Sequence, residues 1–99
     1  MRHYEGLFFL DPVMDEQKLK ETVKSIEDLI KQSKGTVEKI EEWGKKRLQY
    51  SIKGKKDALS YLLYFSIPQD VLAALRKVWQ LKENILRFSI FKTGEQKNG

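Results

Sequence analysis

The sequence predicts an α+β fold, a four-stranded antiparallel sheet with two helices on one face. Segments with the side-chain spacing of strands and helices follow one another in the order strand, helix, strand, strand, helix, strand. The chain has 99 residues, of which 40% are hydrophobic, and this fits one domain with a two-layer core. We expect that domain at residues 1–93 and a flexible tail at 94–99, which are polar.

The first strand is expected at residues 3–10, which are rich in aromatic and aliphatic side chains and end at the turn signal Asp11-Pro12. Asp15 is placed to cap the helix that follows. Gly35 stands where a left-handed residue would end that helix. Apolar side chains three and four residues apart form its buried stripe: Leu19, Val23, Ile26 and Ile30.

A hairpin is expected in the middle of the chain. Residues 36–43 favour a strand, but their apolar positions step by three, so we expect a bulge at Gly44. Alternation is then regular through Ile52. The segment 53–58 has the glycine and the charges of a hairpin tip, and residues 59–67 alternate as the next strand.

The second half of the chain repeats the first. Pro68 suits the first turn of a helix, and Asn84 is expected as its left-handed stop after about Leu81. Residues 85–92 form the last strand. Two split β-α-β units then interlock in the ferredoxin-like arrangement. The buried stripe of this second helix consists of Val71, Leu72, Leu75, Val78 and Trp79.

Alternation assigns each strand residue to one face of the sheet. The side chains expected beneath the helices are Tyr4, Phe8, Leu63, Phe65, Phe88 and Ile90. Those expected on the open face are Leu7, Phe9, Leu62, Tyr64 and Phe91, with Glu5, Ser60, Ser66, Arg87 and Ser89 among them. Such an apolar open face is typical of a partner site. Three interpretations stay open: RNA bases stack on it, a protein covers it, or it is scattered surface hydrophobicity.

The charge of the chain is uneven. Residues 1–44 hold seven Lys/Arg and ten Asp/Glu, a net charge of −3, whereas residues 45–99 hold twelve and four, a net charge of +8. Residues 45–56 contain six cations and no acid. A polyanion would relieve this concentration of charge. On an edge strand the same cations would also discourage pairing with a second copy.

Several function classes find no support in the sequence. His3 is the only histidine and there is no cysteine, so no metal site or nucleophile pair can be assembled from these residue types, and we expect neither metal nor cofactor. Glu41 and Glu42 are adjacent on a strand and point to opposite faces. The arginine loop of an acylphosphatase-like enzyme and the glycine-aromatic run of an RNA-recognition motif are both missing. We also expect no membrane span or signal peptide, and therefore a cytoplasmic, non-enzymatic protein.

Three stretches carry a family resemblance: MRHYEGLFFLDP at the start, EEWGKKRLQYSI in the middle, and FSIPQDVLAAL with its proline-started helix. Together they resemble protein six of the bacterial small ribosomal subunit, over residues 1 to about 93. The resemblance implies the ferredoxin-like fold. It also implies binding of small-subunit ribosomal RNA, together with ribosomal protein eighteen, during assembly. Ser51 departs from the pattern, since many members have a proline there.

The resemblance and the charge pattern together define two sets of candidate residues. Phosphate contacts are expected from Arg2, Lys45, Lys46, Arg47, Lys53, Lys55, Lys56, Arg87 and Lys92. The resemblance places only the first four of these on basic positions of the family. The family's hairpin tip varies, so Lys53, Lys55 and Lys56 inherit no specific role from it. The expected partner-protein interface consists of Leu7, Phe9, Leu48, Tyr50, Leu62, Tyr64 and Phe91. We expect the free protein to be a monomer. A base-stacking RNA module stays the alternative.

Overall fold

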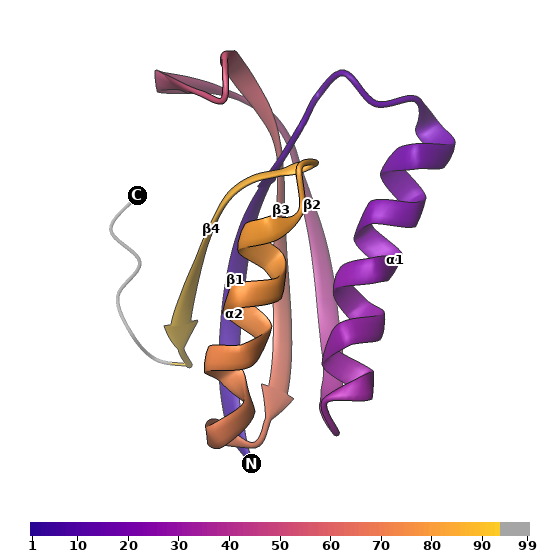
Figure 1. Ribbon diagram of the computed structural model, residues 1–99, viewed down its shortest axis with the longest axis vertical. Helices are drawn as coiled ribbons and strands as arrows, with labels where there is room; N and C mark the ends of the chain where they lie inside the picture. The colour runs from indigo at the N-terminus through magenta and orange to yellow at the C-terminus, as the bar shows by residue number, and fades with distance from the viewer. Residues whose placement is uncertain (94–99) are drawn as a thin grey trace.

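The chain forms its strands and helices in the predicted order (Figure 1). The structure is a computed structural model and describes residues 1–93; the predicted flexible tail, 94–99, lies outside the described residues. Its elements are β1 (Arg2–Leu10), α1 (Glu16–Gln32), β2 (Thr36–Ile52), β3 (Lys55–Ile67), the short 3-10 helix η1 (Gln69–Val71), α2 (Leu72–Leu81) and β4 (Ile85–Lys92).

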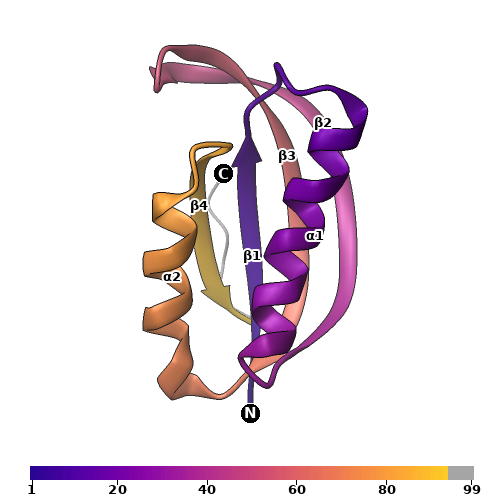
Figure 2. The same cartoon turned by 45° about the vertical axis from the view of Figure 1, so that its right-hand side comes forward.

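The four strands make one antiparallel sheet in the order β2-β3-β1-β4. Both helices lie on the same face of this sheet, with α1 and α2 side by side in front of the strands (Figure 2). The predicted fold class is therefore confirmed. The strand order places β1 and β3 inside the sheet and leaves β2 and β4 as its edges.

Helix α1 is capped at its start as predicted, but its end differs from the prediction. The Asp15 carboxylate accepts a hydrogen bond of 2.7 Å from the backbone N–H of Lys18. At the other end Lys34, with φ of 65°, takes the left-handed conformation that we expected at Gly35. The N–H of Gly35 then bonds the Ile30 carbonyl, and that of Lys34 bonds the Lys31 carbonyl, as in a Schellman motif.

Gly35 is needed for a different reason, which is the space around it. A Cβ atom at this position would lie 2.2 Å from Cγ2 of Ile67 and 2.7 Å from the Ser66 carbonyl oxygen. The glycine thus lets the turn after α1 approach the end of β3 closely.

Helix α2 differs from expectation at its start and in the residue that was expected to stop it. Pro68 precedes η1 as its N-cap residue, so it stands just outside the first turn. The helix ends at Leu81, as predicted, with Lys82 in an extended conformation. Asn84 has no positive φ, so the expected left-handed stop is wrong. Its carbonyl instead accepts the N–H of Asp11, which ties the start of β4 to the end of β1.

The β2–β3 hairpin is longer than predicted. The bulge at Gly44 is confirmed, with φ of 85° and a shift in register between Glu42 and Gly44. Pairing is then interrupted between Arg47 and Ile52, although we expected regular alternation there. The tip consists only of Lys53 and Gly54, both left-handed, and β3 already begins at Lys55.

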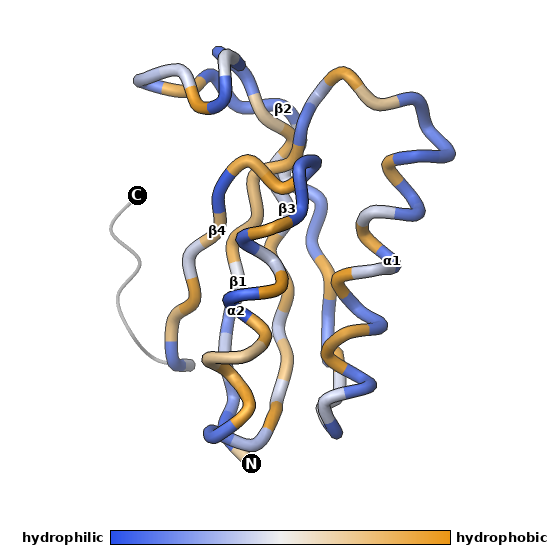
Figure 3. Tube along the Cα trace, in the orientation of Figure 1, coloured by the Kyte–Doolittle hydropathy of each residue, from blue (hydrophilic) through white to orange (hydrophobic). Residues whose placement is uncertain are grey.

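The core lies between the helices and the covered face of the sheet, and it contains the residues predicted for that face. Val78 was predicted for the buried stripe of α2, and this is wrong, because it is 40% exposed. Trp79 of α2 is fully buried and meets Phe8 edge to face at 5.0 Å between ring centroids. Phe65 and Phe88 also meet Trp79 edge to face, at 6.2 Å and 5.8 Å between ring centroids. Such pairs add to the stabilisation that comes from burial of apolar area. Hydrophobic residues accordingly follow the strands and the inner side of each helix (Figure 3).

Candidate nucleic-acid interface

The open face of the sheet is built from three rows of residues that lie opposite one another across the four strands. Directly paired residues on neighbouring strands share a face, so the pairing defines these rows. They are Lys39–Tyr64–Glu5–Phe91, Glu41–Leu62–Leu7–Ser89 and Gly44–Ser60–Phe9–Arg87. The predicted assignment of residues to this face is therefore confirmed.

The exposure of the open face differs from the prediction. Leu62 was expected to be exposed, and this is wrong, because it is only 1% exposed. It lies on an inner strand between Leu7 and Glu41, whose side chains flank it. Glu5, Ser60 and Ser66 are buried for the same reason, since they also lie on the inner strands β1 and β3. The partly exposed apolar residues that remain form what we call the open-face patch: Leu7, Phe9, Tyr64 and Phe91.

Polar side chains of β2 contact one another and Tyr64 along the β2 side of this patch. The Glu41 carboxylate accepts a hydrogen bond of 3.0 Å from the Trp43 indole N–H and pairs with the Lys39 ammonium at 3.1 Å. The ammonium also lies 5.7 Å from the centroid of the Tyr64 ring. The hydrogen bonds from Trp43 and then from Lys39 hold the pKa of the Glu41 carboxyl below its ordinary value. The bond to Glu41 in turn raises the pKa of Lys39.

Trp43 was missing from the predicted interface, although it is 44% exposed. Its place could have been found from the sequence. It stands two residues after Glu41, and alternate residues of a strand share a face, so it extends the open face toward the bulge at Gly44.

Seven of the nine predicted phosphate-binding cations lie at one end of the molecule. Lys45 pairs with Leu59, which pairs with Leu10 at the end of β1, and the hairpin continues beyond this row. We call residues 45–58 the hairpin end. It carries Lys45, Lys46, Arg47, Lys53, Lys55 and Lys56, and Arg87 lies nearby, at the start of β4. Arg2 and Lys92 lie at the opposite end of the sheet, so the structure divides the predicted set in two.

The hairpin end is not a free arm. In both views of the chain it bends over and lies above the start of β4 (Figures 1 and 2). The Lys53 ammonium donates a hydrogen bond of 3.2 Å to the Ile85 carbonyl, and the Lys55 ammonium lies 3.7 Å from the Asp11 carboxylate. Two of its cations therefore fix its position, which leaves the others to face solvent.

The remaining hairpin cations have no carboxylate partner among the residues that the structure describes. Arg47 lies opposite Asp57 in the pairing of β2 with β3, yet their side chains make no ion pair. Lys45, Lys46 and Arg47 are exposed. Like Lys56, they carry charge that nothing in residues 1–93 neutralises by a direct contact.

Leu48 and Tyr50 do not join the open-face patch. They lie in the part of β2 where pairing with β3 is interrupted, and Tyr50 is 77% exposed. Glu41 pairs with Leu62 on the open face, and Tyr50 lies nine residues further along β2. This separation corresponds to roughly 30 Å of extended strand. Leu48 instead lines a hollow of about 230 Å³ together with Arg47 and Lys56.

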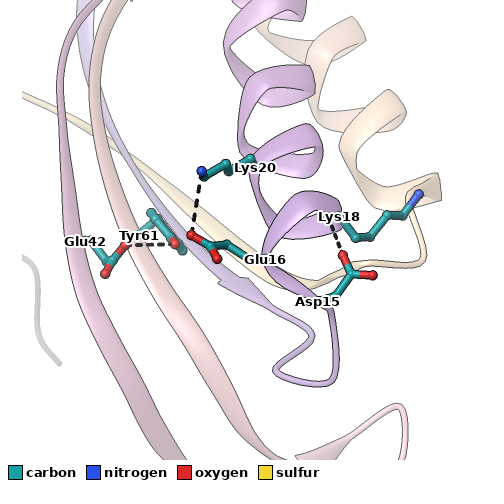
Figure 4. A network of polar contacts seen from close by, with 6 residues as sticks. All are labelled: Asp15, Glu16, Lys18, Lys20, Glu42 and Tyr61. Carbon is teal, nitrogen blue, oxygen red and sulfur yellow. Dashed lines mark hydrogen bonds and ion pairs between the residues drawn. The ribbon is translucent and has the colours of Figure 1, made fainter.

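Another groove, of about 510 Å³, runs between α1 and β2 on the covered side. The Tyr61 hydroxyl donates a hydrogen bond of 3.1 Å to the Glu42 carboxylate there, beside the Glu16–Lys20 ion pair of α1 (Figure 4). Acidic and basic side chains both line this groove, so it does not attract a polyanion as the hairpin end does.

Within residues 1–93, no three His, Asp or Glu side chains gather as metal ligands would. Neither α1 nor α2 is long and apolar enough to cross a bilayer.

A model of the family described as Ribosomal protein S6 matches residues 3–92. The chain belongs to the ribosomal protein S6 family. Its relatives include small ribosomal subunit protein bS6 of Flavobacterium psychrophilum, 36% identical over 88 residues, which are 89% of this chain and 78% of the relative. The corresponding protein of Heliobacterium modesticaldum is 34% identical over 96 residues, 97% of this chain and 100% of that one. The crystal structure of 30S ribosomal protein S6 from Thermotoga maritima superposes with a TM-score of 0.84 at 25% identity, covering 92% of this chain and 86% of that one.

Membership of the S6 family confirms the resemblance and defines the general role of the chain. It is a structural ribosomal protein of the small subunit. Because the matched relatives are structural proteins of the ribosome, the expectation that the chain is not an enzyme is confirmed. The expected place on the cytoplasmic ribosome follows from the same family membership.

Proposed function

We propose that residues 1–93 act as one domain that binds small-subunit ribosomal RNA together with ribosomal protein eighteen. The hairpin end contacts RNA phosphates, and the partner protein covers the open-face patch. The observation that carries this proposal is the grouping of exposed cations without carboxylate partners in residues 1–93 beside a partly exposed apolar surface. RNA phosphates would neutralise these cations, and a partner protein would bury the apolar surface.

A specific contact favours a protein over stacked bases on the open face. The Lys39 ammonium lies over the Tyr64 ring, so that face of the ring is already occupied. Stacking on Tyr64 would have to displace a lysine that is also held by Glu41 at 3.1 Å. A protein surface can cover the patch and leave this arrangement in place.

The phosphate contacts are tested by neutralising three cations of the hairpin end together. The variant Lys45→Gln, Lys46→Gln, Arg47→Gln should fold normally, because all three side chains are exposed. The slope of log affinity against log salt should become shallower by about 0.7 to 0.9 for each phosphate that the protein no longer neutralises. RNA binding is measured with the partner protein present. A slope equal to that of the wild-type protein would refute the phosphate role of this run.

A matched control removes three cations from helix α1, by Lys20→Gln, Lys24→Gln and Lys31→Gln. This change lowers the net charge by the same amount but acts on the mixed-charge groove instead of the hairpin end. Its salt slope should stay that of the wild-type protein. If both triple variants flatten the slope equally, net charge alone explains the effect and the hairpin end has no special role.

The partner contact is tested by Tyr64→Ala with Phe91→Ala. These changes should weaken binding of ribosomal protein eighteen and, through it, binding of RNA in the three-component mixture. RNA binding by the protein alone should be unaffected. Loss of RNA binding in the absence of the partner would favour base stacking and contradict the proposal. Sedimentation of the free wild-type protein tests whether it is a monomer, as we propose.

A further inference from the structure

A hollow of about 230 Å³ lies where the hairpin end meets α2 and the start of β4. Three cations, Lys53, Arg76 and Arg87, line it together with Gln80, and none of its lining residues is acidic. No ion pair joins any of the three to a carboxylate within residues 1–93. Lys53 and Arg76 therefore meet at the hollow from different elements, with Arg87 at its border, and no carboxylate in the described part of the chain compensates these charges directly.

Lys53 is held at this hollow by an unusual backbone conformation. Its φ is 51°, a left-handed value that is uncommon for a residue other than glycine, asparagine or aspartate. The tip of the hairpin thereby turns the lysine toward the start of β4, where its ammonium donates to the Ile85 carbonyl at 3.2 Å. An ammonium has three donors, so two remain for a ligand. Backbone strain of this kind clusters at functional positions.

Arg76 is held on the opposite side of the hollow by an aromatic platform. Its guanidinium carbon lies 5.9 Å from the centroid of the Phe88 ring. That ring is itself packed against Phe8 and Trp79, each with centroids 5.8 Å from its own. A guanidinium that stacks on a ring through its flat face keeps its donors in the plane free for an anion. Arg87 borders the hollow from β4, with its side chain on the open-face side of this edge strand.

We propose that this hollow binds one phosphate of an RNA backbone, with Arg76 and Lys53 as its donors and Arg87 adding positive charge at the adjacent edge of the sheet. The inference rests on the proposed RNA-binding function and deepens it, because it adds a helix, α2, to the RNA surface. A phosphate fits this site better than a neutral ligand, since Arg and Lys donors without an acidic neighbour bind an oxyanion most strongly. The hollow also continues the cationic surface of the hairpin end, so one strand of RNA can contact both.

The first test compares salt dependence in variants that differ by one charge. Arg76→Gln should make the slope of log affinity against log salt shallower by up to about 0.7, the value for one phosphate of a single strand. Lys53→Asn should act in the same direction, because asparagine tolerates the left-handed conformation and preserves the turn. The matched control is Lys77→Gln, the exposed neighbour of Arg76 that does not line the hollow. Equal slopes for Arg76→Gln and Lys77→Gln would overturn the proposal.

The second test needs neither ribosomal RNA nor the partner protein. In an NMR titration of the full chain with a short oligouridine at low salt, the side-chain Nε–H signal of Arg76 and the amide signal of Lys53 should move. Absence of these shifts overturns the proposal even if the protein binds ribosomal RNA elsewhere. Conversely, if these signals move but no binding of small-subunit RNA with the partner is found, the hollow stands and the proposed function fails.

Discussion

The packing around Gly35 gives the sharpest quantitative prediction, for the substitution Gly35→Ala. The new methyl group would lie 2.2 Å from Cγ2 of Ile67, 2.7 Å from the Ser66 carbonyl oxygen and 2.8 Å from Cγ2 of Ile30. Ile30 and Ile67 are fully buried, and the Ser66 oxygen belongs to the backbone of a paired strand. None of these atoms can move aside at low cost. Overpacking of this kind costs about 1–3 kcal/mol, and we expect the upper part of that range.

A second effect offsets part of that cost. Alanine has less conformational freedom than glycine in the unfolded chain, which returns about 0.4–1 kcal/mol where the native conformation suits alanine. Gly35 has no positive φ, so this gain applies. The net prediction is a decrease of about 2 kcal/mol in the free energy of unfolding. This is a large part of the roughly 5–15 kcal/mol that is typical of such domains.

Urea denaturation followed by tryptophan fluorescence measures this decrease. With a slope of about 2 kcal/mol per M, the midpoint should fall by about 1 M without a change in slope. Ile67→Ala removes the nearest clashing atom, so Gly35→Ala should cost less in its presence than alone. The reasoning would be refuted if Gly35→Ala were as stable as the wild type. It would also be refuted if the losses of stability from Gly35→Ala and Ile67→Ala simply added in the double variant.

Three further predictions follow from the structure. Lys34→Gly should raise the free energy of unfolding by about 1 kcal/mol. Relief of the left-handed lysine gains about 1–2 kcal/mol, and the added freedom of glycine in the unfolded chain costs about 0.4–1 kcal/mol. An unchanged or lower urea midpoint contradicts this. Burial and then the hydrogen bond to Glu42 raise the pKa of Tyr61 to about 12, above the ordinary value of about 10. The stabilisation that the protonated Tyr61 hydroxyl contributes is thus fully present below about pH 10 and is lost as the pH rises toward 12. Glu42→Gln should lower the Tyr61 pKa part of the way, measured by ultraviolet titration against Tyr61→Phe; no change would show that the carboxylate has no influence. Trp43 is 44% exposed and Trp79 is buried. Binding of ribosomal protein eighteen should therefore shift the tryptophan fluorescence to shorter wavelength in the wild type but not in Trp43→Phe. A shift that survives this change would place the partner away from the open face.

Local patterns were sufficient for the order of the elements and for the assignment of residues to faces. A strand alternates its side chains at every residue and a helix repeats every 3.6 residues, so Leu19 to Ile30 and Leu59 to Ile67 each showed their buried side in the sequence. The cap at Asp15 and the bulge at Gly44 depend on one or two residues and were also predictable. The position of the left-handed residue after α1 was not, because packing against β3 requires the missing side chain at Gly35 and moves that conformation to Lys34.

What the sequence by itself determined was therefore the fold, the faces of the sheet and the concentration of charge in residues 45–56. The tertiary structure alone decided which of these side chains meet. Leu62 is buried because the neighbouring strands flank it. Arg76 and Lys53 line the same hollow because the hairpin end bends toward the start of β4. Contacts of this kind depend on sheet twist and on the docking of segments that are distant in the chain. Neither of these leaves a periodic signal in the sequence.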